Sequence, residues 1–152
     1  MEARPSLCIV KGSGPVETFV RAHAEGLPAR VTLIHDFPPR IHDRPVLSHA
    51  LPGRAWRKAL RFLRRREWEW EITSAYLKVF RRARPKAVLA EFGQTGVAVL
   101  EACRRTGVPL IVHFHGADIS KHEVLRAYAD AYPALFREAR AIVGCRGRCR
   151  NG

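Results

Sequence analysis

The sequence predicts an α/β domain in which a parallel sheet is covered by helices on both faces. Two observations carry this prediction. Apolar runs of strand length alternate along the chain with stretches of helical periodicity, and each run is almost continuously apolar. Continuous apolar runs are typical of strands buried on both faces, which is the usual environment of a parallel strand. We therefore expect a Rossmann-like fold of ordinary domain size for the 152 residues.

The first strand, turn and helix form the clearest unit. An apolar strand at residues 6–10 is followed by a glycine-bearing turn. Gly14 can then serve as the N-cap of a helix, with Pro15 at the first helical position, where its missing N–H costs nothing. Glu17 favours the first turn because its charge complements the helix dipole. The predicted helix covers about residues 16–25.

The remaining elements follow from the same kinds of signal. We expect further strands at residues 30–37, 86–92, 108–114 and near 142, and helices at 54–84 and 95–106. The helix at 95–106 ends where Gly107 can adopt a left-handed conformation. Ser120 and Glu123 fit a capping box, which predicts one more helical region, and Pro133 divides that region in two.

Charge is the unusual property of the composition. Lys and Arg number 27 against 14 Asp and Glu, a formal net charge of +13, which favours an anionic partner. Basic residues crowd the first half of the 54–84 helix, which we interpret either as a solvated face or as an amphipathic surface for an anionic membrane. The candidate membrane-surface residues are Arg54, Trp56, Arg57, Lys58, Arg61, Phe62, Arg64 and Arg65. No recognised nucleic-acid-binding motif accompanies the charge, so no nucleic-acid partner is expected.

The cysteines and the N-terminus bear on location. Cys8 and Cys103 lie in apolar segments and are expected to be small buried hydrophobic residues. Cys145 and Cys149 have no second pair of ligands near them, so no structural zinc site is expected there. The chain shows no signal-peptide pattern and no apolar stretch of membrane-spanning length. We expect a cytoplasmic protein, and peripheral attachment at the inner face of the cytoplasmic membrane is left open.

Three chemistry-bearing segments follow predicted strands. They are the turn Lys11–Gly14, the segment Glu91–Gln94 and the segment His115–Asp118. Ligands of open parallel sheets bind beyond the carboxyl ends of the strands, so these segments are expected to lie near one site. A glycine turn before a helix can approach a phosphate, although an ordinary strand–helix turn has the same sequence pattern. The candidate substrate-binding residues are Gly12, Ser13, Gly14, Glu91, Gly93, Gly116 and Asp118.

Two histidines interrupt the last of these strands. His113 and His115 lie two residues apart, so they point to the same face of an extended strand. They could be a metal pair, but no motif supplies a third ligand, and no metal is expected. His113 is interpreted as a hydrogen-bonded residue of the core. His115 stands nearer the strand end, where an imidazole can bond a ligand hydroxyl or phosphate, or transfer a proton near neutral pH.

The order of four segments resembles a known family. The segments are Gly12–Pro28, Ala90–Val112, His113–Ser120 and Leu135–Gly144, and together they span nearly the whole chain. In order and spacing they resemble the N-terminal half of glycosyltransferase family 4, whose members have the two-domain GT-B architecture. The "HFHGADIS" segment after "GVPLIV" is the most specific part of this resemblance.

The resemblance implies a retaining transfer of a sugar from a nucleotide-sugar donor to a saccharide or lipid-linked acceptor, as in cell-envelope polysaccharide biosynthesis. It implies no cofactor and no divalent metal. By position, His115 matches the family's active-site histidine, and Gly12 and Gly14 match the glycine turn close to the donor phosphate and the acceptor. Asp118 matches an acid of less fixed role. Many members also attach to membranes by a basic surface on this domain.

The end of the sequence departs from the family pattern. Family enzymes carry a second Rossmann-like domain that binds the nucleotide sugar, and the tail "CRGRCRNG" has no apolar periodicity. We therefore expect a domain at residues 1–144 and an irregular tail at 145–152 from truncation or a frameshift. Loss of donor binding removes orientation and electrostatic stabilisation, so an isolated half is expected to be nearly inactive. The alternative is a non-catalytic basic membrane-surface or adaptor module.

Overall fold

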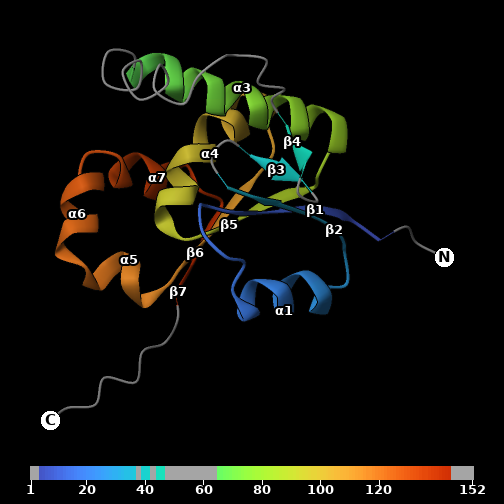
Figure 1. Cartoon of the computed structure of the whole chain (residues 1–152), viewed down its shortest axis with the longest axis horizontal. Helices are drawn as coiled ribbons and strands as arrows, with labels where there is room; N and C mark the ends of the chain where they lie inside the picture. Colours follow the sequence, from blue (N-terminus) through green and yellow to red (C-terminus); the bar gives the residue numbers. More distant parts are fainter. Residues whose placement is uncertain (1–3, 37–38, 42–43, 47–64, 145–152) are drawn as a thin grey trace, which may run out of the picture.

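The computed structural model describes residues 4–36, 39–41, 44–46 and 65–144, and these fold around one sheet (Figure 1). The described strands are β1 (Ser6–Lys11), β2 (Arg30–His35), β3 (Arg40–Ile41), β4 (Arg44–Pro45), β5 (Ala87–Glu91), β6 (Leu110–Phe114) and β7 (Ala141–Gly144). The described helices are α1 (Thr18–Gly26), α3 (Arg65–Ala83), α4 (Gly93–Thr106), α5 (Gly116–Ser120), α6 (His122–Tyr128) and α7 (Tyr132–Glu138).

The sheet is mainly parallel, as predicted. Its strand order is β4-β3-β2-β1-β5-β6-β7, and β1 pairs in parallel with both β2 and β5. β6 and β7 continue the parallel part, while the two-residue strands β3 and β4 add antiparallel pairs beside β2. The chain builds the sheet outward from β1 in both directions, so the topological switch point lies between β1 and β5. The predicted α/β, Rossmann-like fold is confirmed.

Side-chain alternation along the strands defines two different faces. Val10, Val88 and Val112 are fully buried in the main core on the side of α3 and α4. The intervening positions point to the opposite face, toward α1, whose buried residue is Val20. Figure 1 shows α1 on the other side of the sheet from α3 and α4. The prediction of helices on both faces is confirmed, and the α1 face is the thinner layer in the described part of the chain.

Two predicted helix starts are wrong. α1 begins at Thr18, and Gly14 and Pro15 remain in the preceding loop. The buried ammonium of Lys11 lies 3.2 Å from the carbonyl oxygen of Ser13 and 2.6 Å from that of Pro15. These bonds hold the loop in a non-helical path, and Gly14 adopts a φ of 106° that favours glycine.

The capping box predicted at Ser120 is also wrong. Ser120 ends α5, and α6 begins after Lys121 with no side-chain hydrogen bond at its N-cap. The cap forms one helix earlier, because a carboxylate oxygen of Asp118 accepts the backbone N–H of His115 at 2.9 Å. This is one half of a capping box, the reach of an N3 acid back to the N-cap N–H, whereas the side chain of the N-cap residue His115 bonds to Glu91 instead.

Other predicted boundaries hold or shift by a few residues. Gly107 caps α4 with a φ of 68°, and Pro133 lies in the first turn of α7, so the break between α6 and α7 is confirmed. α4 begins at Gly93, two residues before the predicted start. Trp70 of α3 is 58% exposed, with the guanidinium of Arg105 5.3 Å from its ring centroid. None of the described helices is long and apolar enough to cross a membrane.

The start of α4 has no room for a side chain at Gly93. A Cβ atom built there would lie 2.4 Å from Cε1 of Phe114 and 2.8 Å from the hydroxyl of Tyr132. We expect Gly93→Ala to lower the free energy of unfolding by about 1–3 kcal/mol through overpacking, measured by urea denaturation. Gly26→Ala is the control, because nothing lies within 4 Å of a Cβ there, and it should leave stability unchanged or raise it. Equal stability of Gly93→Ala and the native chain would contradict the packing seen here.

Candidate functional site

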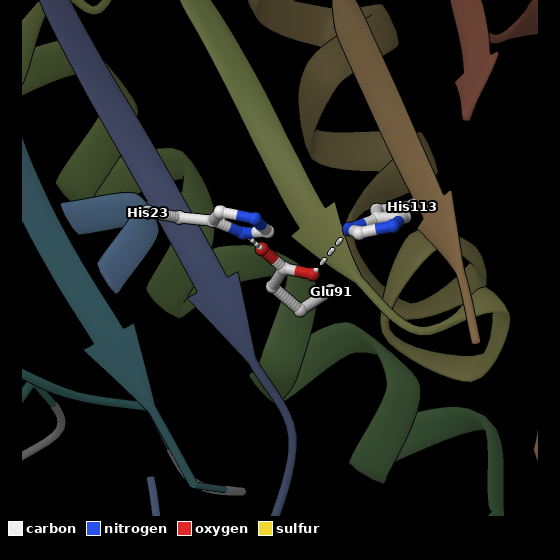
Figure 2. A group of neighbouring side chains, drawn as sticks. All are labelled: His23, Glu91 and His113. Atoms are coloured by element: carbon white, nitrogen blue, oxygen red, sulfur yellow. Dashed lines mark hydrogen bonds and ion pairs between the residues drawn. The ribbon is translucent and has the colours of Figure 1, made fainter. Parts of the chain in front are cut away.

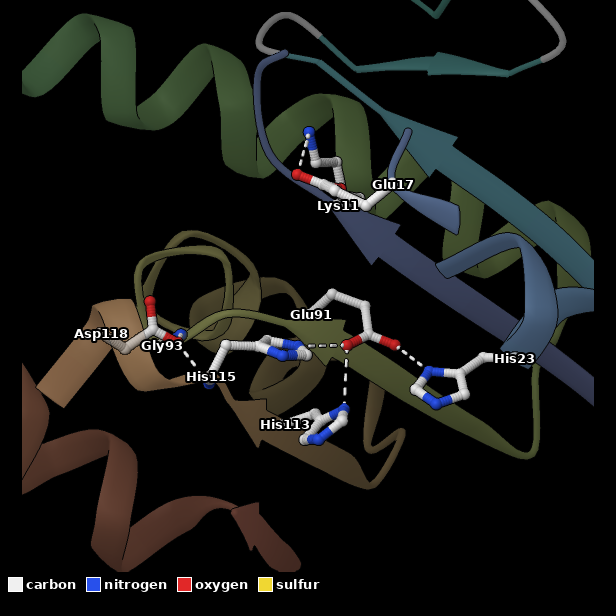
Figure 3. Close-up of polar contacts among 8 residues, drawn as sticks. All are labelled: Lys11, Glu17, His23, Glu91, Gly93, His113, His115 and Asp118. Carbon is white, nitrogen blue, oxygen red and sulfur yellow. Dashed lines mark hydrogen bonds and ion pairs between the residues drawn. The ribbon is translucent and has the colours of Figure 1, made fainter. Parts of the chain in front are cut away.

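Three polar residues form one row at the carboxyl edge of the sheet. Lys11 pairs in register with Glu91, and Glu91 pairs with His113, so the three occupy adjacent positions on β1, β5 and β6. Alternation places all three on the α1 face (Figure 3). The row crosses the switch point between β1 and β5, which is where open parallel sheets bind ligands.

Glu91 is the centre of the site. It has no exposed surface, and its Oε1 lies 2.7 Å from Nδ1 of His23. Its Oε2 lies 3.1 Å from Nδ1 of His113 and 2.9 Å from Nε2 of His115. A carboxylate can only accept hydrogen bonds, so each facing ring nitrogen is assigned as the donor. One buried acid thus sets the orientation and the tautomer of three imidazoles.

Sequence reasoning missed His23, which comes from α1 rather than from a strand end. A weak signal was present, since Val16, Phe19, Val20 and His23 follow helical spacing that places the histidine on the sheet-facing side. Its partner on β5 is 68 residues away in sequence, and no local pattern connects the two. The predicted hydrogen bonding of His113 is confirmed, although its partner lies at the edge of the core rather than inside it.

Burial changes the pKa of His113. Loss of solvent lowers the pKa of His113 below its usual value, and the neighbouring His115 and His23 act in the same direction. The charge and hydrogen bond of Glu91 oppose this decrease in pKa but do not outweigh it. His113 is therefore biased toward the neutral form, in which one ring nitrogen donates and the other can accept.

Aromatic rings fix the position of His115. Its ring centroid lies 4.5 Å from the centroids of both Phe19 and Phe92. Phe92 has a φ of 79°, an uncommon conformation for a residue with a side chain, and it is the N-cap of α4. Strained backbone of this kind costs about 1–3 kcal/mol and is frequent at functional sites. The strain turns the chain sharply after Glu91 and brings the Phe92 ring against the imidazole.

Asp118 joins two loops behind the site. Its side chain is fully buried, and Oδ2 accepts the backbone N–H groups of His115 at 2.9 Å and Gly93 at 3.3 Å. Oδ1 is also buried and has no hydrogen-bond partner among the described residues. This geometry makes Asp118 a positioning residue for His115, and direct contact between Asp118 and a substrate stays a prediction. Gly116 is exposed at the start of α5.

The N-terminus of α1, where the sequence suggested a phosphate, is occupied by a carboxylate in the structure. Glu17 is the N-cap of α1, and its Oε1 lies 3.4 Å from the ammonium of Lys11. A carboxylate therefore stands at the helix start where an anionic ligand was expected, which disfavours a phosphate on this helix terminus. Ser13 and Gly14 are exposed, and Gly12 is partly buried. Ligand contact by Gly12, Ser13 and Gly14 stays a prediction, and it would involve groups of the loop rather than the N-terminus of α1.

A hollow of about 540 Å³ and another of about 590 Å³ lie elsewhere on the surface. The larger one borders the β1–α1 loop, and its lining is Gly14, Pro15, Val16, Arg21, Ala24, Glu25, Leu33, His35 and Asp36. Its volume is that of a small-molecule site. It lies on the β2 side of α1, whereas Glu91 and His115 lie on the β5 side, so α1 separates the two.

The structure thus brings together some predicted site residues and leaves others untested. Glu91, Gly93, His115 and Asp118 meet within one hydrogen-bonded group. Residues 54–64, which carry most of the predicted membrane surface, lie outside the described residues, as do Cys145 and Cys149. Arg65 is described by its backbone alone, as the first residue of α3.

The prediction for the two cysteines of the apolar segments is confirmed. Cys8 and Cys103 are buried in the core on the α4 side. Burial raises the pKa of both thiols to about 12, so they stay protonated and act as small hydrophobic side chains.

Comparisons of the chain with protein-family models, with curated proteins and with solved structures found no match. The fold and the site define the chain by themselves as a Rossmann-like α/β domain. Its characteristic feature is a buried glutamate that binds three histidines at the switch point of the sheet.

Proposed function

We propose that the chain is the acceptor-side domain of a retaining glycosyltransferase, which transfers a sugar from a nucleotide-sugar donor to a saccharide or lipid-linked acceptor. The observation that supports this most is the position of His115. It follows the carboxyl end of β6 beside the switch point, bonded to buried Glu91 and flanked by two aromatic rings. The proposal also rests on the sequence resemblance, which assigns the same histidine to the reacting centre.

Each neighbouring residue has a role in this proposal. His115 touches the transferred sugar or the acceptor hydroxyl, where Nδ1 can accept a hydrogen bond while Nε2–H is donated to Glu91. Glu91 orients the ring through Nε2, as the third member of a catalytic group orients a base. Phe19 and Phe92 pack against the ring and against each other, with centroids 6.1 Å apart, so they shield one side of the imidazole from water and strengthen polar contacts to a bound ligand. A second domain binds the nucleotide, as the resemblance implies.

A basic membrane-surface or adaptor module is the second candidate, and one feature of the described residues favours it. The smaller hollow lies at the amino end of β5, and four cationic side chains line it: Arg81, Arg84, Lys86 and Arg105. Together with the formal net charge of +13, this concentration of cations suits an anionic surface. The hollow is at the opposite end of β5 from Glu91, so the two functions can coexist.

The test joins the chain in frame to the donor-binding domain of a family 4 glycosyltransferase and incubates it with nucleotide sugars and a panel of saccharide and lipid-linked acceptors. We expect sugar transfer with retained anomeric configuration by the fusion, and little or none by either half alone. Transfer by the donor domain alone at the same rate would contradict the proposal. A fusion that floats with anionic vesicles at low salt but transfers no sugar would favour the module instead.

A further inference from the structure

His23, Glu91 and His113 present the donor atoms of a transition-metal site (Figure 2). Each residue offers one ligand atom, and these atoms all lie within 4.8 Å of one another. The three residues come from α1, β5 and β6, so secondary-structure elements rather than flexible loops hold them in place. Two imidazoles and one carboxylate form a ligand set that recurs in zinc and non-haem iron sites.

The complete burial of Glu91 is a second observation. Its side chain has no exposed surface, and its hydrogen bonds and ion pairs with the described residues all go to histidines. A buried carboxylate therefore lacks a permanently charged partner in this part of the chain. The three imidazole contacts offset part of the cost of burying this carboxylate, and a bound cation would supply the opposite charge that buried carboxylates normally have.

The spacing requires a small adjustment to admit an ion. Ligand atoms of a tetrahedral zinc lie about 2.0–2.2 Å from the metal, and therefore about 3.3 Å from one another. In the structure, Glu91 Oε1 is 2.7 Å from Nδ1 of His23, and Oε2 is 3.1 Å from Nδ1 of His113. Coordination spacing requires these two contacts to open by about 0.6 Å and about 0.2 Å, and the ligand atoms, which all lie within 4.8 Å of one another, to approach that spacing. Each imidazole then carries its proton on Nε2 instead of Nδ1, so its charge does not change.

We propose that His23, Glu91 and His113 bind a divalent transition-metal ion of the zinc class. The side chain of His23 is 36% exposed, which gives the ion a route from solvent on the α1 side. His115, whose ring centroid is 4.2 Å from that of His113, stands beside the ion as a hydrogen-bond partner of Glu91. The metal site shares Glu91 with the proposed sugar-transfer site but uses different histidines, and the proposed transfer needs no metal.

Ligand chemistry decides the class of metal. Imidazole nitrogen suits Zn²⁺, Co²⁺, Ni²⁺ and Cu²⁺, whereas Mg²⁺ and Ca²⁺ prefer sites made of oxygen atoms. With one carboxylate and two imidazoles, the site should bind Zn²⁺ and Co²⁺ and ignore Mg²⁺. Binding also ties α1 to the strands, so it should stabilise the folded chain by mass action.

The experiment measures Zn²⁺ binding calorimetrically after removal of metal by a chelator. Cys145 and Cys149 are changed to serine in every variant, so that thiols outside the described residues cannot contribute. We expect one Zn²⁺ per chain, a rise of the melting temperature with Zn²⁺, and no response to Mg²⁺. In His23→Gln the affinity should fall by at least about 100-fold, since even groups behind the ligands commonly cost 10–100-fold.

The matched control is His122→Gln, which removes an exposed histidine on α6. It should bind Zn²⁺ as the parent does, and circular dichroism should show the same folded content in all variants. Glu91→Gln keeps the side-chain shape and should also weaken binding. The proposal is overturned if the parent binds neither Zn²⁺ nor Co²⁺, or if neither His23→Gln nor Glu91→Gln weakens binding. Such results would leave the transfer assay unaffected, so the two proposals fail separately.

Discussion

Replacing His115 with alanine in the fusion to a donor-binding domain is expected to reduce sugar transfer by about 10²–10⁴-fold, the usual contribution of a positioned acid–base group. The imidazole is held by Glu91 at 2.9 Å and by contact with the rings of Phe19 and Phe92, so it is fixed before a substrate arrives. Its loss should appear mainly in kcat, because a preorganised group contributes most in the transition state. Initial rates at saturating donor and acceptor measure this.

Two comparisons separate a chemical role of His115 from a structural one. His115→Asn retains a side-chain hydrogen bond but not proton transfer, so an intermediate rate would indicate that positioning dominates. His122→Ala removes an exposed histidine of α6 and should transfer sugar at the parental rate. If His115→Ala is folded and turns over as fast as the parent, the residue does not belong to the site and the proposed function loses its main support.

Local sequence patterns were sufficient for the central strands β1, β5 and β6, because these are largely buried. The apolar run at β1 and the run at β6 could not be solvated, so their place in a parallel sheet followed from composition. Gly107 marked the end of α4 because a left-handed residue is needed there. The short antiparallel strands β3 and β4 were not predicted, since two residues carry no periodicity.

The site was predictable in part. Glu91 and His115 were found because the ends of parallel strands meet at one edge. His23 was missed because a helix residue reaches the same edge only once the orientation of α1 is known. The sequence places Lys11 in a turn that could bind a phosphate. In the structure, its ammonium donates hydrogen bonds to carbonyl oxygens of that loop. Long-range side-chain contacts of this kind leave no trace in local spacing.

The hydrogen bonds of Asp118 explain why the capping box predicted at Ser120 does not form. An acid at the third helical position can bond back to the N-cap, and two acids between residues 115 and 123 stand three positions after a possible N-cap: Asp118 after His115 and Glu123 after Ser120. The structure selects the one in which the acid is buried, because Asp118 also bonds to Gly93 of the neighbouring loop. Tertiary contact, rather than local propensity, decides the cap.

Asp118→Ala is therefore expected to lower the free energy of unfolding by about 2–4 kcal/mol, the largest stability change predicted for the site. Its carboxylate accepts two backbone N–H groups, and each hydrogen bond to a charged group contributes about 1.5–3 kcal/mol. Urea denaturation measures the change. Asp130→Ala is the matched control, since Asp130 is an exposed acid and its loss should change stability by less than about 0.5 kcal/mol.

The same substitution should also affect the fusion at temperatures where it remains folded. Without the carboxylate, the loops after β5 and β6 lose their shared anchor, and His115 loses its fixed backbone position. A displacement of about 1 Å at a reacting group can reduce turnover by about 100-fold, so transfer should fall while the circular dichroism spectrum stays native. Native stability combined with normal transfer in Asp118→Ala would show that the buried carboxylate anchors neither the fold nor the histidine.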